Sequence, residues 1–173
     1  MKSSLLERTD VKPHSKEALK RRTEFIEGFK SGVPIAVGYI PIAVAFGLLA
    51  KSSGVPDYIS IMMSAFVFAG ASQFVGVNLM AMGAAPSEVI MTTLLLNIRH
   101  FLMAASISLK MDKDTPKGWR ALLSYGITDE TFSVASLNDK DRLHPCYLLG
   151  LNIIAYVSWN IGTWIGLFMA AGL

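Results

Sequence analysis

The residues best suited to do chemistry are Asn97, Arg99 and His100, which interrupt an apolar run from Val89 to Leu109. A run of that length is what a helix needs in order to span a bilayer. An arginine near the middle of such a helix costs about 3 kcal/mol on insertion scales, so it normally faces a partner, a cavity or a pathway. The sequence therefore indicates that this chain handles something polar inside a membrane.

The roles open to these side chains follow from their charge. Arg99 stays protonated, so we expect it either to bind a carboxylate, from a substrate or from the protein, or to hold a helix bundle together. His100 titrates near neutral pH and could move protons, or it could be a neutral histidine bonded to a carbonyl or hydroxyl group. On a helix, Asn97 and His100 share a face and Arg99 lies about 100° away.

Two acids offer a counterpart to the arginine. Asp129 and Glu130 lie about midway along the apolar segment from 119 to 138, so either they are inside the membrane or this segment does not cross it. An ion pair with Arg99 would neutralise a charge that is costly to bury alone. A titratable carboxylate at mid-depth is also a natural site for a coupling proton. Both roles stay open, and they can coexist.

The elements that must position these residues follow from the distribution of charge. Mean hydropathy is +0.44, and no charged side chain occurs in 31–50, 58–87 or 143–173. Each run reaches or exceeds the roughly 20 residues that cross a hydrocarbon core. We therefore expect an all-α fold, a polytopic transmembrane helical bundle with discontinuous or re-entrant helices. Its transmembrane domain, residues 31–173, would contain apolar segments at about 31–50, 58–82, 88–109, 119–138 and 145–172.

Residues 1–30 are expected to form a cytosolic, basic, amphipathic N-terminal segment, with eight Lys and Arg residues and five acids. The stretch from Glu17 to Glu27 is predicted to be a helix at the membrane surface, with a solvated tail as the simpler alternative. The near balance of charge and the scarcity of aromatic residues argue against a nucleic-acid partner. The basic part is too long for a secretory signal, and the positive-inside rule predicts a cytoplasmic N-terminus.

The sequence gives little support for a metal site, a bound cofactor or an enzymatic function. Cys146 is the only cysteine and the three histidines lie far apart, so neither a disulfide nor a metal site is expected. We expect no cofactor, and the chain has no phosphate-cradling Walker motif. An intramembrane enzyme using His100 with Asp129 is the least favoured class, because the sequence has no nucleophile elbow.

Two segments carry helix breakers near their midpoints. Pro41 lies about halfway along the first, and Gly70 lies in the middle of the second. Carbonyls that a break frees in lipid must bond protein or cavity water, and paired interrupted helices are a recurrent way in which transporters build substrate sites. The alternative is close packing at the glycine and a simple kink at the proline. We favour a cavity and a second segment that is re-entrant or discontinuous.

The last apolar segment has small-xxx-small spacing at Gly162 and Gly166, which predicts close packing against a neighbouring helix. Trp159 and Asn160 lie near its middle. They could line a pathway, but packing is the favoured interpretation.

Together these motifs resemble the AzlC family, the large subunits of bacterial branched-chain amino-acid exporters. The resemblance runs from about residue 24 to the end, and its most specific parts are Ala69–Phe74 and Asn97–His100. The other matching motifs are Gly28–Pro34, Gly38, Pro41, Phe46–Gly47, Thr128–Glu130 and Trp159–Thr163. Family members usually continue beyond the last segment present here, so we interpret the chain as a short or C-terminally truncated homologue.

The resemblance implies secondary transport: export of branched-chain amino acids, with methionine a further candidate, across the bacterial inner membrane. The driving force would be the membrane potential or a proton gradient. The implied partners are a small AzlD-like membrane subunit and the amino-acid substrate, besides the lipid bilayer, and a homo-oligomer is a further expectation. The competing class is an ion or small-solute channel built from re-entrant helices.

The predicted site combines the broken helices with the charged one. Backbone amides around Gly70 and the Arg99 side chain would bind the substrate carboxylate, and carbonyls near Pro41 would accept from its ammonium group. Phe46, Phe74 and Leu96 would surround the aliphatic side chain. The predicted substrate-binding set is Pro41, Phe46, Gly70, Ala71, Ser72, Gln73, Asn97 and Arg99, and the predicted proton-coupling or ion-pair set is His100, Asp129 and Glu130.

Overall fold

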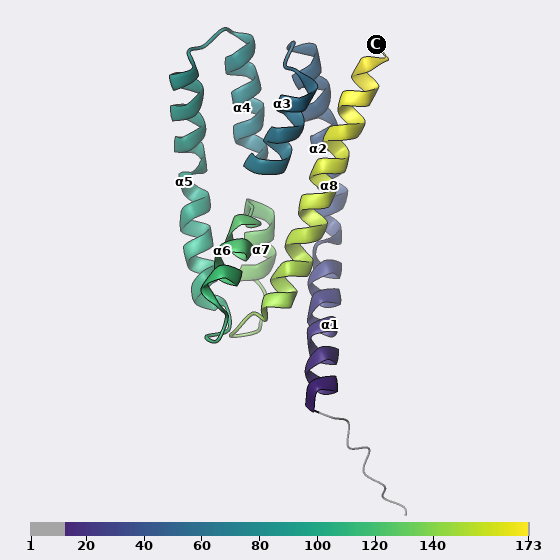
Figure 1. The fold of residues 1–173 in the computed structure, drawn as a ribbon, viewed down its shortest axis with the longest axis vertical. Coiled ribbons are helices and arrows are strands. Elements are labelled where there is room, and N and C mark those ends of the chain that lie inside the picture. The colour runs from purple at the N-terminus through teal and green to yellow at the C-terminus, as the bar shows by residue number, and fades with distance from the viewer. Residues whose placement is uncertain (1–12, 173) are drawn as a thin grey trace, which may run out of the picture.

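The long helices of the molecule run nearly side by side along its longest axis (Figure 1). The computed structural model describes residues 13–172, and within them every regular element is helical apart from an isolated β-bridge between Met111 and Leu143. Three helices are long and apolar enough to cross a membrane: α2 (Val33–Ser52), α5 (Pro86–Lys110) and α8 (Pro145–Ala171). The expected all-α membrane fold is confirmed.

Two of the apolar segments fold back as hairpins. The upper hairpin consists of α3 (Asp57–Met62), the π-helical turn η1 (Met63–Val67) and α4 (Gly70–Ala81). The lower hairpin consists of α6 (Lys117–Tyr125) and α7 (Asp129–Ser136). Figure 1 shows the upper hairpin entering from the end where α2 finishes and the lower hairpin entering from the opposite end, so that their tips approach each other partway along the bundle. The expectation of re-entrant helices is therefore met twice.

The tip of the upper hairpin explains the break that the sequence predicts near Gly70. The π-helical turn ends at Phe68, whose φ of 45° and ψ of 44° are left-handed, and Ala69 is extended at φ −139°. A left-handed residue stops a right-handed helix, and the chain restarts as α4 at Gly70. The segment thus reverses direction at this point.

The prediction that the first apolar helix breaks at Pro41 is wrong. Pro41 lies inside α2, which runs unbroken from Val33 to Ser52. A proline removes one backbone hydrogen bond, but α8 packs closely against α2 beside and after the proline, from Ile40 to Gly47. A Cβ atom on Gly47 would lie 2.5 Å from the Thr163 carbonyl oxygen, and one on Gly162 would lie 2.6 Å from Ala43 Cβ. The predicted close packing at Gly162 is therefore confirmed.

The helix α1 (Pro13–Ser31) continues the direction of α2 past Gly32 (Figure 1). Gly28 packs against the backbone of Tyr147 on α8, which holds α1 upright against the bundle. This differs from the expected helix along the membrane surface. The first twelve residues of the expected N-terminal segment lie outside the described residues.

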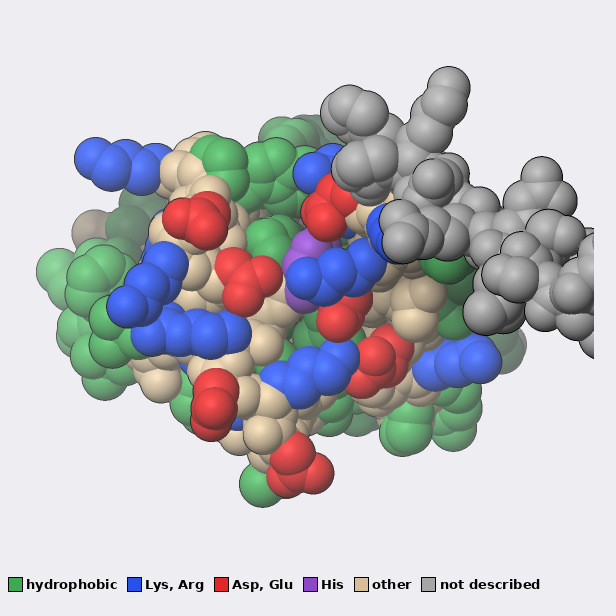
Figure 2. Space-filling view, turned by 90° about the horizontal axis from the view of Figure 1, so that it is seen from below, with side chains coloured by type: hydrophobic (Ala, Val, Ile, Leu, Met, Phe, Trp, Pro, Cys, Tyr) green, Lys and Arg blue, Asp and Glu red, His purple; other side chains and the backbone are tan. Residues whose placement is uncertain are grey.

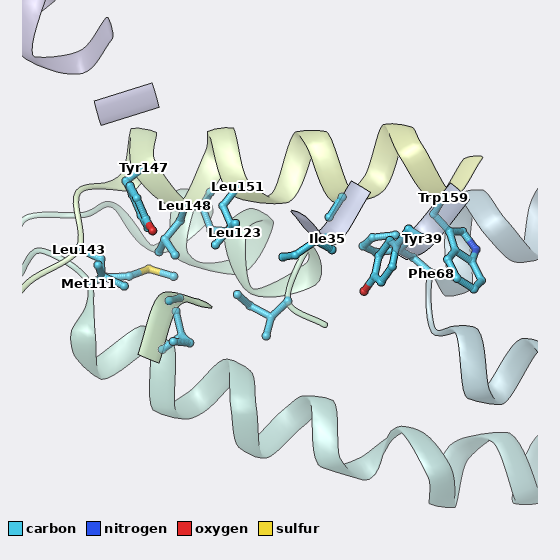
Figure 3. Close-up of a cluster of buried hydrophobic side chains, with 14 of the residues drawn as sticks. Ile35, Tyr39, Phe68, Met111, Leu123, Leu143, Tyr147, Leu148, Leu151 and Trp159 are labelled. Carbon is cyan, nitrogen blue, oxygen red and sulfur yellow. The ribbon is translucent and has the colours of Figure 1, made fainter. Parts of the chain in front are cut away.

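Most of the buried hydrophobic side chains form one cluster between α8 and the hairpins, and a smaller cluster of Phe46, Ala50, Val55 and Val77 lies between α2 and the upper hairpin. Figure 3 shows the larger cluster running from Met111, Leu143 and Tyr147 at one end to Tyr39, Phe68 and Trp159 near the hairpin tips. Because α8 contributes along the whole length, it serves as the common wall on which both hairpins rest.

The lower end of the molecule is strongly charged. Figure 2 views this end and shows lysines, arginines and acids over the face, with hydrophobic side chains at its edges. Lys140 lies 3.1 Å from Glu24 and 3.0 Å from Glu27, which ties the loop after the lower hairpin to α1. Burial opposes the charge on Lys140, but the two carboxylates outweigh it and raise the pKa of that amine.

Candidate functional site

A cavity of about 300 Å³ lies where the tips of the two hairpins meet α2, α5 and α8. Its walls combine charged, polar and apolar groups. The lining residues are Tyr39, Ile42, Phe68, Ala69, Gly70, Ala71, Phe74, Arg99, His100, Thr128, Asp129, Glu130 and Trp159. Six of the eleven predicted site residues are among them.

The upper hairpin brings the start of α4 to this cavity. The residue before the helix is Ala69, and no side chain caps the helix. The first backbone N–H groups of an α-helix have no partner within the helix, and the helix dipole adds partial positive charge there. Gly70 and Ala71 line the cavity, so a bare positive helix end borders it.

The lower hairpin brings a second helix start to the cavity, and there acidic side chains already neutralise the positive end of the helix dipole. The Thr128 hydroxyl accepts a hydrogen bond from the Thr131 amide and so caps α7. The first two residues of α7 are Asp129 and Glu130, and acids are favourable there because they face the positive end of the helix dipole. The sequence Thr-Asp-Glu thus fixes both carboxylates beside the cavity.

The arginine of α5 pairs with one of these acids. Arg99 Nη2 lies 3.0 Å from Asp129 Oδ2, and the two side chains are 47% and 46% exposed. Because both side chains are only half covered, part of the guanidinium group and part of the carboxylate stay accessible while the ion pair is formed. The geometry therefore leaves Arg99 able to meet a second anion and Asp129 able to meet a second cation.

The other acid is held by α2. The Tyr39 hydroxyl donates a hydrogen bond to the Glu130 carboxylate and lies 2.7 Å from Thr128 Oγ1. Tyr39 itself is buried. A tyrosine on α2 therefore fixes the start of the lower hairpin's second helix.

The apolar wall centres on Trp159 of α8. Its ring lies edge-on to Tyr39 at 5.3 Å and stacks on Phe46 at 6.4 Å between centroids. A Cβ atom on Gly70 would lie 2.7 Å from Trp159 Cη2, so glycine lets the helix start approach the indole. Within the described residues, no group accepts the hydrogen of the buried Trp159 Nε1.

Five predicted residues do not line the cavity. Phe46 is fully buried behind Trp159, and Pro41 is not among the lining residues. Ser72 donates a hydrogen bond to Asn97 of α5, while Gln73 Nε2 donates to Ser64 Oγ at 2.9 Å. Ser72 and Gln73 therefore fasten the upper hairpin rather than face the cavity.

A second cavity, of about 320 Å³, lies on the other side of the upper hairpin's tip. It shares Phe68, Ala69 and His100 with the first, and Asn97 lines it too. His100 therefore borders both cavities. Within the described residues, its buried Nδ1 atom has no hydrogen-bond partner.

Several carbonyl groups of the hairpins accept hydrogen bonds from protein side chains. Ala65, in the π-helical turn, accepts hydrogen bonds from the Tyr125 and Tyr156 hydroxyls at 2.7 and 3.0 Å. Asn152 of α8 donates to the Leu123 carbonyl at 2.8 Å, and Asn160 approaches the Ser64 carbonyl at 3.5 Å. These bonds contribute to the internal hydrogen bonding that backbone groups require at membrane depth.

Six lining residues were not among the residues predicted to form the site: Tyr39, Ile42, Phe68, Ala69, Thr128 and Trp159. For Trp159 the sequence left lining of a pathway as the alternative to packing. Tyr39 stands two residues before Pro41, in a stretch whose marked sequence features are helix breakers. Its partner Glu130 is 91 positions away, so no local signal joins them. Within the described residues, no group of three or more His, Cys, Asp and Glu side chains could hold a metal ion.

Comparisons with known proteins agree on one family. The profile of the AzlC protein family matches residues 34–173. The inner membrane protein YgaZ of Escherichia coli (strain K12) is 34% identical over 152 residues, which cover 86% of this chain and 62% of YgaZ. An uncharacterized membrane protein of Archaeoglobus fulgidus is 31% identical over 156 residues, covering 90% of this chain and 67% of its own length.

A functionally named relative is more distant. The branched-chain amino acid transport protein AzlC of Bacillus subtilis (strain 168) is 30% identical over 121 residues, covering 67% of this chain and 46% of its own length. The chain therefore spans less than two thirds of both named relatives, at 62% of YgaZ and 46% of this protein. No solved structure matches the chain.

Proposed function

This chain belongs to the AzlC family, and from that premise we propose that it exports branched-chain amino acids through the cavity between its two hairpins. The printed name of the Bacillus subtilis relative supports this cargo. The observation that carries the proposal is the chemistry of the cavity, in which a bare helix start and an arginine stand opposite two carboxylates. An amino acid has a carboxylate for the helix start and the arginine, and an ammonium group for the two carboxylates.

The recognition we propose uses both ends of the zwitterion. The substrate carboxylate binds the amides at the start of α4 and the exposed part of Arg99, as anions do at helix N-termini. The substrate ammonium group binds Asp129 and Glu130. The substrate thus inserts between Arg99 and Asp129 and replaces their ion pair with two new ones, which limits the cost of opening that pair.

The apolar wall would select the side chain. Ile42, Phe74 and Trp159 line the remaining part of the cavity, and an aliphatic side chain buried there gains about 25 cal/mol for each Å² removed from water. A volume of about 300 Å³ is at the lower limit of the range for small-molecule sites. This supports a single amino acid rather than a peptide.

The orientation that we propose follows from the basic residues. At the lower end, α1, the 110–117 loop, α6 and the 138–142 loop carry eleven described Lys and Arg residues, whereas the upper end has Lys51. Positively charged loops stay in the cytoplasm, so the lower end, with α1, is cytoplasmic. The membrane is the bacterial inner membrane, and an AzlD-like subunit remains the proposed partner.

The energy coupling that we propose uses the groups beside Arg99. In the empty site Asp129 pairs with Arg99, so the exchanged proton would be carried by Glu130, and His100 lies at the same cavity. Intramembrane carboxylates commonly serve as proton sites in transporters. The antiported proton would then compete with the substrate for the same carboxylate.

Efflux of labelled leucine from cells that express the chain with its proposed partner tests this function. We expect Arg99→Gln and Gly70→Leu to lower the rate at least about tenfold, because each removes a carboxylate contact or fills the space beside Trp159. The matched controls are Arg22→Gln, at an exposed site on α1, and Gly118→Leu, where a Cβ atom meets nothing within 4 Å. Normal efflux by both site variants, at normal membrane levels, would refute the proposal.

A channel is the competing function, because hairpins that enter from opposite ends and meet are also a way to line a pore. Electrical recording separates the two classes. Saturable, stereoselective leucine flux at transporter rates supports the exporter, whereas ion currents that greatly exceed such rates would support the channel.

A further inference from the structure

The chain contains two similar units that run in opposite directions. The first unit is α2 with the upper hairpin, and the second is α5 with the lower hairpin. Figure 1 shows α2 running towards the upper end and α5 running towards the lower end, each followed by a hairpin from the end it reaches. Inverted repeats of this kind often surround the midplane site of a transporter.

Local geometry supports the equivalence of the two units. Each hairpin starts after a proline of nearly the same conformation, Pro56 at φ −57°, ψ 139° and Pro116 at φ −58°, ψ 147°. Each second half-helix follows an extended residue, Ala69 at φ −139° or Thr128 at φ −117°. The two hairpins therefore begin alike and restart after an extended residue, although ψ is 89° at Ala69 and 175° at Thr128 and the left-handed Phe68 belongs to the upper turn alone among the described residues.

A spacing of 58 positions relates several side chains, whereas the starts of α4 and α7 are 59 positions apart and Pro56 and Pro116 are 60 apart. Fifty-eight positions separate the last residue of α2, Ser52, from the last residue of α5, Lys110. The same spacing relates Phe74 of α4 to Phe132 of α7. Both phenylalanines are partly buried against the core, so the spacing joins residues in equivalent environments.

Two hydrogen bonds between the units are related by the same spacing, because both partners of one bond lie 58 positions from the corresponding partners of the other. Tyr39 of the first unit donates to Glu130 in the second unit's hairpin, and Ser72 in the first unit's hairpin donates to Asn97 of the second unit. Tyr39 and Asn97 are 58 positions apart, and so are Ser72 and Glu130. Each long helix therefore holds the hairpin of the other unit, near the start of its second half-helix.

We propose that these two bonds are the latches that set the end of the molecule to which the cavity opens. Releasing Tyr39 from Glu130 frees the lower hairpin and opens the cavity downwards, whereas releasing Ser72 from Asn97 frees the upper hairpin and opens it upwards. Tyr39 and Asn97 are thus positioning residues with equivalent roles. The inference rests on the proposed function, because it describes access to the same cavity.

Asymmetry in the other contacts strengthens the assignment. The upper hairpin is also held to α8 by Ser64, which lies 2.8 Å from Thr163 Oγ1, whereas the lower hairpin is held to α8 by Asn152. Those contacts lie away from the cavity. Each latch joins a second half-helix, near its start, to the long helix of the other unit, whereas the Arg99–Asp129 ion pair joins the lower hairpin to α5 of its own unit. Breaking one latch therefore changes access without removing the hairpin's attachment to α8.

The test measures access to the cavity from each end. In a Cys146→Ser background, Ala71→Cys places a thiol in the cavity wall, and a membrane-impermeant thiol reagent is applied to vesicles of either orientation. Tyr39→Phe is expected to raise labelling from the lower end about tenfold, as loss of a bond to a charged group does. Ser72→Ala is expected to raise labelling from the upper end about fivefold, and neither variant changes the opposite end.

Matched controls and second variants keep the result decisive. Tyr58→Phe and Ser87→Ala change the same residue types at exposed sites and should leave both rates unchanged. Glu130→Ala should reproduce Tyr39→Phe, and Asn97→Ala should reproduce Ser72→Ala, because each removes the same latch from its other side. Labelling that rises from one common end in all variants, or that changes in none, would overturn the proposal. The assay contains no amino acid and no gradient, so failed efflux with normal latch behaviour refutes only the proposed function.

Discussion

The two hairpins have similar backbone courses, but the helix starts that they bring to the cavity carry opposite charge. Each turns back partway along the bundle and presents the start of a second half-helix to the same cavity. At the upper hairpin that start is Gly70-Ala71, without a cap, whereas at the lower hairpin it is Asp129-Glu130 behind a threonine cap. The backbone creates a positive helix end in both, and the side chains decide whether it stays free for a ligand.

Under the proposed function, this difference would let a nearly symmetric frame hold an asymmetric ligand. A zwitterion has one negative and one positive end, and a symmetric pair of bare helix ends would bind two anions instead. The acids of the lower hairpin reverse the sign on one side, and Arg99 adds to the positive side.

The largest effect is expected from exchanging the charges of the ion pair. The double variant Arg99→Asp with Asp129→Arg keeps a pair at the same place, so we expect near-normal thermal stability in detergent. It moves the positive group away from the start of α4, so leucine efflux should remain about 100-fold below that of the unmodified chain, as expected for two lost charged contacts. Recovery of efflux in the double variant would show that Arg99 serves only to form the ion pair and does not bind the substrate.

A slightly smaller effect is expected from giving the upper hairpin an acid. Ala71 lies 58 positions before Asp129, and its exposed side chain lines the cavity, so Ala71→Asp makes the upper helix start resemble the lower one. The added carboxylate repels the substrate carboxylate and should weaken leucine binding at least about tenfold. Ala71→Asn, which has similar size and no charge, is the control. Equal binding by the aspartate and asparagine variants would contradict a carboxylate site at this helix start.

The sequence could predict part of this comparison because some constraints are local. An arginine and two acids in apolar segments must find partners, and the structure pairs Arg99 with Asp129. A run of Ala, Gly and Ser around Gly70 marks a weak point in a helix, and the chain breaks there. Charge placement and helix breaking act over a few residues, so composition reveals them.

The remainder depends on contacts between distant parts of the chain. The straight course of α2 through Pro41 depends on packing against α8, and the place of Tyr39 in the site depends on Glu130 in the lower hairpin. The lower hairpin turns at Gly126 and Ile127, which differ from the turn residues of the upper hairpin. Tertiary contacts of this kind have no periodic signal within one segment.

A moderate effect on stability is expected from removing the cap of the lower hairpin. Thr128→Ala leaves the Thr131 amide without its side-chain acceptor and should cost about 1 kcal/mol. For a chain of this size that corresponds to a fall of about 2–4 °C in the melting temperature in detergent. Thr93→Ala, which removes only a bond to a carbonyl within its own helix, is the control. An equal fall in both variants would show that Thr128 acts as an ordinary helix residue.

The smallest effect is expected at the charged anchors of the hairpins. Lys140 binds Glu24 and Glu27 beside the lower hairpin, and Lys51 binds Asp57 beside the upper hairpin, at 2.8 Å. These pairs are partly exposed, so Lys140→Met and Lys51→Met should each cost less than about 1 kcal/mol.

The pH dependence of the Lys140 anchor has a definite sign. Its carboxylate partners raise the pKa of Lys140. A group with a raised pKa contributes fully below its ordinary pKa, and its contribution falls only as the pH passes through the raised value. The effect of Lys140→Met on the melting temperature should therefore be equal at pH 7 and pH 9. A marked decrease in that effect by pH 9 would contradict the ion pair.

The most direct test of the central claim is ligand binding reported by Trp159, in a chain that carries Trp119→Phe and Trp164→Phe and is held in lipid nanodiscs. Trp119 and Trp164 are exposed, whereas Trp159 lines the cavity. We predict a saturable change in Trp159 fluorescence with leucine, and none with leucinamide or N-acetylleucine, each of which lacks one charge of the zwitterion. No response to leucine, or equal responses to all three compounds, would contradict a zwitterion site between the two hairpins.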